Sequence, residues 1–126
     1  MQILIVDDST AMRKILRRIV ETLGFKVVEA GHGIEAMQQL GSFPTTEVAL
    51  VDWNMPEMNG LDFVKAVRAN PLYEQTKLVM VTSETDPTKM ARAMMAGADE
   101  FLMKPFTAEM LLDKLHLIGL TMPRVC

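Results

Sequence analysis

The sequence has few of the residues that mark secreted, membrane-spanning or nucleic-acid-binding proteins. Its only cysteine is Cys126, so no disulfide can form within the chain. Positive charge is also scarce, because 13 lysines and arginines face 16 acids and leave a net charge of −3. That balance argues against a general affinity for nucleic acid or an anionic membrane.

Long apolar runs are missing as well. None approaches the roughly 20 residues that a membrane span needs. Met1 leads directly into QILIV, without the basic segment that opens a signal peptide. We therefore expect a cytoplasmic protein that contacts neither a membrane nor nucleic acid directly.

What the sequence does contain is typical of one globular domain. The chain has 126 residues, of which 49% are apolar and 23% are charged, and this length can bury a substantial core. No repeat, linker or low-complexity stretch interrupts it. We expect one domain over residues 1–120 and a C-terminal tail over 121–126.

Short apolar runs alternate with segments of helical periodicity. The runs predict strands at 2–6, 25–30, 48–52, 77–82 and 100–104. The periodic segments predict helices from Ser9 to Gly24, over 33–40, over 61–70, over 87–96 and from Thr107. Several runs are almost wholly apolar, which favours a parallel sheet covered on both faces. The expected fold class is therefore α/β, a doubly wound five-stranded parallel sheet with five helices.

The same periodicity predicts which helical side chains face the core. These are Met12, Ile15, Leu16, Ile19, Val20 and Leu23 in the first helix, Ile34, Met37 and Leu40 in the second, and positions 110, 111, 112, 115 and 118 in the last. Met80 and Met103 fit the core too, whereas Met90, Met94 and Met95 cannot all be buried, so that one of them could serve an adaptable partner surface.

Residues 48–60, VALVDWNMPEMNG, end an apolar strand on a carboxylate and continue in turn-forming residues. An ionised side chain at the edge of a core is costly unless something pairs with it. The other predicted strands also end on polar residues, and the carboxyl ends of parallel strands share one edge of the sheet. That edge would gather Asp7, Asp8, Asp52, Thr82 with Ser83, and Lys104.

Three carboxylates at one edge would repel one another, and a single lysine could not balance them. Two like charges about 4 Å apart repel by roughly 4 kcal/mol at an effective dielectric constant near 20. Either some carboxyl pKa values are raised, or a hard divalent cation compensates the charge. Carboxylate and water oxygens suit Mg²⁺, which rarely receives a full cage of protein ligands. The sequence thus predicts that Asp52 forms one wall of a magnesium site.

Four motifs at these strand ends are identified together as those of a known family. LIVDDS, VDWNMPEMNG, VMVTSE and FLMKPF follow in this order, and the chain as a whole resembles the response-regulator receiver domains of two-component signalling, including the chemotaxis type. The resemblance implies a flavodoxin-like fold with strand order 2-1-3-4-5.

The resemblance also implies roles for single residues. Asp52 would accept a phosphoryl group from a histidine of a partner kinase. Asp8 and Asp52 would bind Mg²⁺ through their carboxylates, Asn54 through its main-chain carbonyl, and Asp7 largely through water. Thr82 would hydrogen-bond one phosphoryl oxygen and Lys104 would pair with another.

The output of the switch would pass through Thr82 and Phe101. In the family an aromatic residue at the latter position turns inward as the hydroxyl moves toward the phosphate. Many chemotaxis-type members have tyrosine there, so Phe101 offers a partner no hydroxyl. The family also has a cis bond at the position of Lys104–Pro105. The implied partners are a sensor histidine kinase or phosphotransfer protein, and a downstream protein that binds the face of the fourth helix, fifth strand and fifth helix.

Each of these residues also has a plainer explanation. Acids before Ser9 suit a helix N-terminus, and Asp52 could begin an Asx-turn. Thr82 and Lys104, taken singly, are ordinary strand-end and surface residues, and Trp53 is expected to be partly exposed beside the site. His32 and His116 lie too far apart in the sequence to indicate a metal site. The basic residues of the first helix, Arg13, Lys14, Arg17 and Arg18, are interpreted as its solvated face, with docking to an acidic kinase surface as the alternative.

Three functions compete at this point. The first is a phosphorylation-dependent switch that is not an enzyme on an external substrate but assists its own phosphorylation and dephosphorylation. The second is a phosphatase of the haloacid-dehalogenase type, which needs its two acids two residues apart, whereas VDDS has them adjacent. The third is a binding module that works without phosphorylation. A switch could stand alone, or could be a receiver cut from a regulator with DNA-binding or enzymatic output.

Overall fold

A computed structural model shows that the chain folds as a three-layer α/β sandwich. The structure describes residues 2–43, 45–55, 58–83 and 85–120, so the predicted tail lies outside the described residues. The strands are β1 (Gln2–Val6), β2 (Lys26–Ala30), β3 (Val48–Asp52), β4 (Lys77–Thr82) and β5 (Glu100–Met103). The helices are α1 (Thr10–Thr22), α2 (Gly33–Ser42), α3 (Gly60–Arg68), α4 (Pro87–Ala96) and α5 (Ala108–Leu117), with a 3-10 turn at Pro71–Tyr73.

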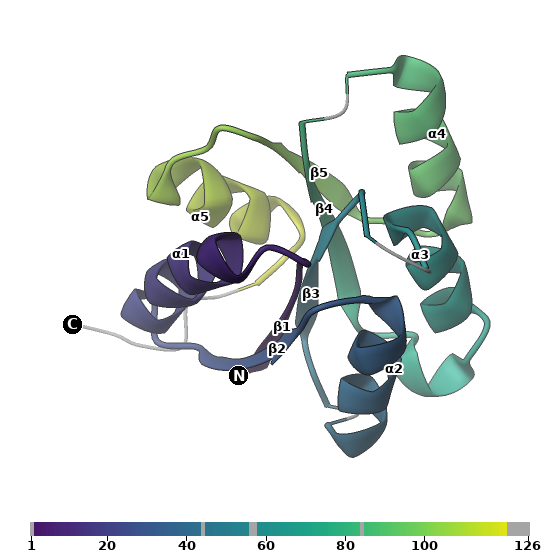
Figure 1. The fold of residues 1–126 in the computed structure, drawn as a ribbon, viewed down its shortest axis with the longest axis horizontal. Coiled ribbons are helices and arrows are strands. Elements are labelled where there is room, and N and C mark those ends of the chain that lie inside the picture. The colour runs from purple at the N-terminus through teal and green to yellow at the C-terminus, as the bar shows by residue number, and fades with distance from the viewer. Residues whose placement is uncertain (1, 44, 56–57, 84, 121–126) are drawn as a thin grey trace.

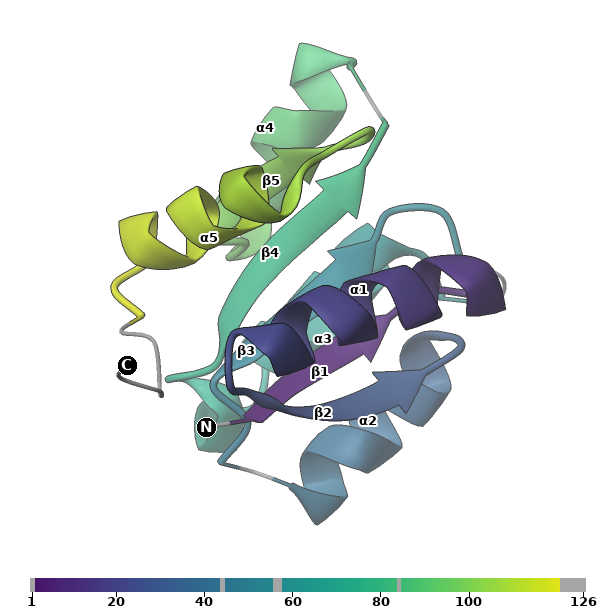
Figure 2. The same ribbon diagram turned by 90° about the vertical axis from the view of Figure 1, so that its left-hand side faces the viewer.

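All five strands are parallel and form one sheet in the order β2-β1-β3-β4-β5. Figure 1 shows α1 and α5 on one face of the sheet and α2, α3 and α4 on the other, and Figure 2 shows the twist of the strands between them. The predicted fold class and the strand order implied by the resemblance are confirmed. The helices of the described part of the chain are each too short or too polar to span a bilayer.

The pleat of the strands divides the core between the two faces. Ile3, Leu50 and Val81 pack with α1 and α5, whereas Leu4, Val51 and Met80 pack with α2, α3 and α4. Successive side chains of a strand point to opposite faces, and near-continuous apolar strands therefore fill both layers. The apolar runs that predicted a two-sided parallel sheet are explained by this arrangement.

Polar side chains cap the helices where the sequence indicated a start. Ser9, Asn59 and Thr107 each accept a hydrogen bond from a main-chain N–H in the first turn of α1, α3 and α5. At the end of α4, Gly97 has φ +123°, and a Cβ there would lie 2.4 Å from Cγ of Arg68. Glycine is therefore required at that turn both by the backbone conformation and by the close packing.

Several predicted details are corrected. Ile15, Ile34 and Met110 were expected to face the core but are 51%, 44% and 40% exposed. In α1, Leu16 and Val20 already cover the sheet, so Ile15 lies on the outer flank of the helix. The second helix runs on through Gly41 to Ser42, and the fifth strand ends at Met103, one residue earlier than expected.

The amino edge of the sheet holds two buried threonines. Thr76 precedes β4, and its hydroxyl donates to the main-chain oxygen of Thr46 at 2.9 Å. The hydroxyl of Thr46, before β3, donates to the main-chain oxygen of Phe43 at 2.6 Å. Both side chains are neutral, and each hydroxyl is satisfied by the main chain.

Candidate functional site

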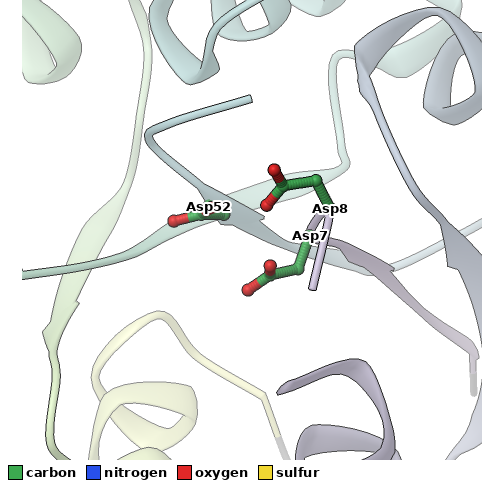
Figure 3. Close-up of side chains that lie close together, drawn as sticks. All are labelled: Asp7, Asp8 and Asp52. Atoms are coloured by element: carbon green, nitrogen blue, oxygen red, sulfur yellow. The ribbon is translucent and has the colours of Figure 1, made fainter. Parts of the chain in front are cut away.

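The strand ends place the predicted site residues at the opposite, carboxyl edge. Asp7 and Asp8 follow β1, while Asp52 is the last residue of β3. Asp52 continues the row of Val48 and Leu50, whose side chains lie on the α1 and α5 face. In Figure 3 the three carboxylates extend in the same general direction from two neighbouring strands. The juxtaposition expected from the sequence is confirmed.

The three acids lie close enough to share one ion. One carboxylate oxygen from each of Asp7, Asp8 and Asp52 lies within 4.8 Å of the others. Asp7 and Asp52 are only 1% and 8% exposed, whereas Asp8 is exposed. The Asp7 carboxylate also accepts a hydrogen bond of 2.8 Å from the main-chain N–H of Ser9, which fixes its orientation. Asp7 is therefore held by the main chain, and the cluster is open to solvent at Asp8.

Lys104 supplies the cation of this edge. Its Nζ lies 3.3 Å from Oδ1 of Asp52 and 3.5 Å from Oδ2 of Asp7. It follows β5 directly, and its main-chain N–H donates to the main-chain oxygen of Thr82 at 2.9 Å. The bond from Lys104 to Pro105 is cis, as the resemblance implied. One ammonium cannot balance three carboxylates, so the edge retains an excess of negative charge.

The pKa of Asp52 reflects this imbalance. Burial raises it above its ordinary value of 3.8, and the charge of Asp7 raises it further. Lys104 opposes both effects, and Asp8 adds a smaller increase. The cost of ionising Asp52 is therefore set mainly by removal from water, which a bound cation would offset.

These donors fit Mg²⁺. The ion takes oxygen ligands, usually a few carboxylates together with water, and the buried carboxylates of Asp7 and Asp52 face an open side where water can enter. Asp7, Asp8 and Asp52 could each offer it one carboxylate oxygen. The Asn54 side chain is exposed two residues after Asp52.

The loop behind Asp52 folds tightly back onto it. The main-chain N–H of Gly60 donates to the oxygen of Trp53 at 2.9 Å, and a Cβ on Gly60 would lie 2.9 Å from the oxygen of Asp52. Glycine permits this close approach. Trp53 was expected to be partly exposed but is only 7% exposed, because the loop carries its indole into the core under α2, α3 and α4.

Thr82 and Phe101 lie on one face of the sheet. Phe101 pairs with Met80 across β4 and β5, and Thr82 is two residues beyond Met80. Both are buried, at 1% and 7% exposure, and Phe101 belongs to the same core cluster as Ala93 of α4. The ring is therefore turned inward, in the core cluster that includes residues of α4.

One contact was missed by the sequence interpretation. Arg13 was assigned to a solvated face, yet its Nη1 donates to the main-chain oxygen of Asp7 at 2.6 Å and its Nε lies 3.1 Å from Glu29 of β2. Arg17 also pairs with Glu29, whereas Lys14 and Arg18 are exposed as expected. The sequence did contain a signal for these ion pairs, because Arg13 and Arg17 lie four residues apart and the neighbouring strand carries an acid.

Comparison with known proteins gives a consistent result. The Response regulator receiver domain model matches residues 3–116. The chain is 42% identical over 119 residues to chemotaxis protein CheY1 of Helicobacter pylori, covering 94% of this chain and 96% of the relative. It is 44% identical over 117 residues to a CheY homolog of Campylobacter jejuni, covering 92% of this chain and 90% of the relative.

The same likeness holds among solved structures. Chemotaxis protein CheY4 of Vibrio cholerae superposes with a TM-score of 0.87 at 37% identity, covering 93% of this chain and 97% of that one. Receiver domains are signalling proteins rather than classical enzymes, so a phosphatase finds no support. The chain belongs to the response regulator receiver domain family and is a CheY-like receiver of a two-component signalling system.

Proposed function

We propose that this receiver is a phosphorylation-dependent switch in which Asp52 is the phosphoacceptor. The observation that carries the proposal is the setting of Asp52. It is a nearly buried carboxylate at a strand end, 3.3 Å from the Lys104 ammonium and within 4.8 Å of two further acids. An isolated structural acid would not be placed among like charges.

Phosphoryl transfer depends mainly on positioning and charge neutralisation. A carboxylate oxygen of Asp52 attacks the phosphorus of a phosphohistidine on a kinase or phosphotransfer protein. The phosphorus–nitrogen bond breaks, and the imidazole leaves with the electron pair and takes up a proton. Bound Mg²⁺ supplies positive charge for the phosphoryl oxygens. Lys104 pairs with one of these oxygens, and Thr82 donates its hydroxyl to another. In this sense the domain assists its own phosphorylation and dephosphorylation.

The signal then leaves through Phe101. Because Thr82 and Phe101 lie on the same face of the sheet, movement of the hydroxyl toward the phosphoryl group changes the space available to the ring. The affected surface is formed by α4, β5 and α5, where a downstream protein binds. Chemotaxis in the cytoplasm is the proposed setting, because the most similar relatives reported above are chemotaxis proteins. Residues 1–120 form the receiver and 121–126 its tail.

Fluorescence of Trp53 tests the proposal, since the indole follows Asp52 directly. The purified protein is titrated with Mg²⁺ and then with beryllofluoride, a phosphoryl analogue. We expect a change on Mg²⁺ addition and a second, saturable and Mg²⁺-dependent change with the analogue. Asp52→Asn should lack the second change. Mass spectrometry after acetyl phosphate treatment should show one added phosphoryl group in the wild type only.

The opposite result has a clear meaning. If neither ligand changes the fluorescence and no phosphoryl group is gained, the acidic cluster is silent. The domain would then act as a binding module that works without phosphorylation.

A further inference from the structure

A shallow groove lies between α3 and α4, away from the acidic cluster. It encloses about 260 Å³ and is lined by Leu61, Lys65, Arg92, Met95 and Ala96. The two helices contact each other and lie side by side in Figure 1. The groove is on the flank of α4 that faces α3, so it is separate from the surface of α4, β5 and α5 assigned above.

The lining is mostly apolar. Met95 is 88% exposed, a large fraction for an apolar side chain on a helix with a packed inner face. Leu61 and Ala96 are half-buried beside it. A methionine is flexible and polarisable and can adapt to different partner side chains. This groove therefore offers apolar area that a partner could remove from water.

The charges of the groove are all of one sign. Lys65 and Arg92 are its only ionisable lining residues, and within the described ranges neither forms an ion pair. Elsewhere in the described chain some cations pair with acids, as seen for Arg13, Arg17, Arg68, Lys104 and Lys114, whereas others, such as Lys14 and Arg18, do not. Two unpaired cations beside exposed apolar area, on a chain with net charge −3, favour an acidic ligand.

A larger hollow on α1 does not have this character. It encloses about 480 Å³ and is lined by Lys14, Arg17, Arg18, Glu21 and Thr22. Its positive charge is partly compensated, because Arg17 lies 3.3 Å from Glu21. It also has no large apolar side chain among its lining residues, so the groove beside α4 is the better candidate.

The walls of the groove are held in place at one end. Arg68, the last residue of α3, donates to the main-chain oxygen of Gly97 at 2.9 Å and pairs with Asp99 at 2.9 Å. It also donates to the main-chain oxygen of Tyr73 at 3.2 Å. The C-terminal ends of α3 and α4 are thereby tied together, and the groove is formed before any ligand arrives.

We infer that this groove binds an acidic amphipathic helix of a partner protein. A third helix is the element that fits between two neighbouring helices. Its apolar side chains would pack on Met95 and Leu61, and its carboxylates would pair with Lys65 and Arg92. Nothing in this contact requires Asp52, so the inference goes beyond the proposed function and stands or falls separately.

A library of helix-forming 16-residue peptides, displayed on phage and selected on the full chain, tests the inference. Selected peptides should be negatively charged, with apolar residues at helical spacing. In protein labelled with ¹³C at the methionine methyl groups, they should shift the Met95 signal saturably. The signals of Met94 and Met110, which are exposed outside the groove, serve as internal references.

Charge reversal provides the matched comparison. Lys65→Glu with Arg92→Glu should weaken peptide binding about 10-fold or more, because attraction becomes repulsion. Lys14→Glu with Arg18→Glu makes the same change of charge on α1 and should leave binding unchanged. Asp52→Asn should also bind normally, which separates this test from that of the phosphorylation site.

Three results would overturn the inference. The selection could yield no acidic amphipathic peptides, or the selected peptides could bind the Lys65→Glu, Arg92→Glu protein as well as the wild type. As a third result, the Met95 signal could shift with protein concentration in the absence of peptide, while sedimentation shows a dimer. The groove would then be an interface between two copies of the chain.

Discussion

The two edges of the sheet differ in how their buried polar side chains are satisfied. At the amino edge, Thr46 and Thr76 are 4% and 2% exposed, and each hydroxyl donates to a main-chain oxygen. At the carboxyl edge, Asp7 and Asp52 are similarly buried, at 1% and 8% exposure, but carry charge, and both pair with the ammonium of Lys104. The two threonines of the amino edge are satisfied by the main chain, whereas the carboxyl edge is left with excess negative charge.

The difference teaches where to look for function in such a fold. Buried polar groups are normally satisfied within the protein. The two threonines of the amino edge follow that rule, although Nε2 of Gln2, at the start of β1, has no hydrogen-bond partner among the described residues. The carboxyl edge follows it only in part, and the remaining charge calls for a ligand of opposite sign. Burial alone does not distinguish the functional site, since polar side chains are buried at both edges. The uncompensated charge distinguishes it.

The largest contrast is expected in Mg²⁺ affinity. Asp8→Ala removes an exposed carboxylate that is proposed to bind the ion and should lower the affinity about 100-fold, measured by titration of Trp53 fluorescence. Thr76→Val, at the other edge, should leave it unchanged. Equal affinities in the wild type and Asp8→Ala would show that the ion does not use this carboxylate.

Breaking the ion pairs of Lys104 at the carboxyl edge should cost stability. Lys104→Met leaves Asp7 and Asp52 without their cation and should lower the free energy of unfolding by about 3 kcal/mol. Urea denaturation in EDTA measures this, and saturating Mg²⁺ should recover much of the loss because the ion binds the folded chain. A loss that Mg²⁺ cannot restore would mean that Lys104 acts through packing instead.

At the amino edge the expected cost is smaller and independent of metal. Thr76→Val removes the hydroxyl that donates to the oxygen of Thr46 and should lower the free energy of unfolding by about 1.5 kcal/mol. The same value should be obtained with EDTA and with Mg²⁺. A Mg²⁺-dependent cost would show that the two edges are coupled.

The mildest effect concerns pH. Because the pKa of Asp52 is raised by burial and by Asp7, the folded chain holds a proton that the unfolded chain has already lost. In EDTA, the free energy of unfolding should therefore fall as pH rises from the ordinary carboxyl pKa through the raised one. Asp52→Asn lacks this contribution, so its advantage in stability over the wild type should grow across that window. An advantage that stays constant from pH 4 to 7 would contradict the raised pKa.

Much of this architecture is visible in the sequence. Near-continuous apolar strands predicted a parallel sheet, and topology then placed Asp7, Asp52 and Lys104 at one edge without further information. Periodicity was less reliable at the margins of helices. Ile15 and Ile34 fit an apolar stripe, but a helix on a sheet buries only a narrow face, and their exposure depends on its rotation.

The site itself shows what sequence patterns miss. The burial of Trp53 depends on a loop that folds back through Gly60, and the role of Arg13 depends on Glu29 of a neighbouring strand. Both are contacts between elements, set by how the layers pack. The turn-forming residues of segment 53–60 predict a reversal of the chain, but they do not predict in which direction the indole of Trp53 points.

The long sequence separation between Lys104 and the acids that it pairs with has a consequence for synthesis of the chain. Lys104 and Asp7 are 97 residues apart in sequence, and β5 is the last strand and lies at the edge of the sheet. A ribosome completes the three acids long before it makes the lysine, and chains fold from the N-terminus as they emerge. A nascent chain that stops short of β5 therefore has the carboxylates without their counter-ion. The counter-ion of the acidic cluster is supplied only after Lys104 has been translated.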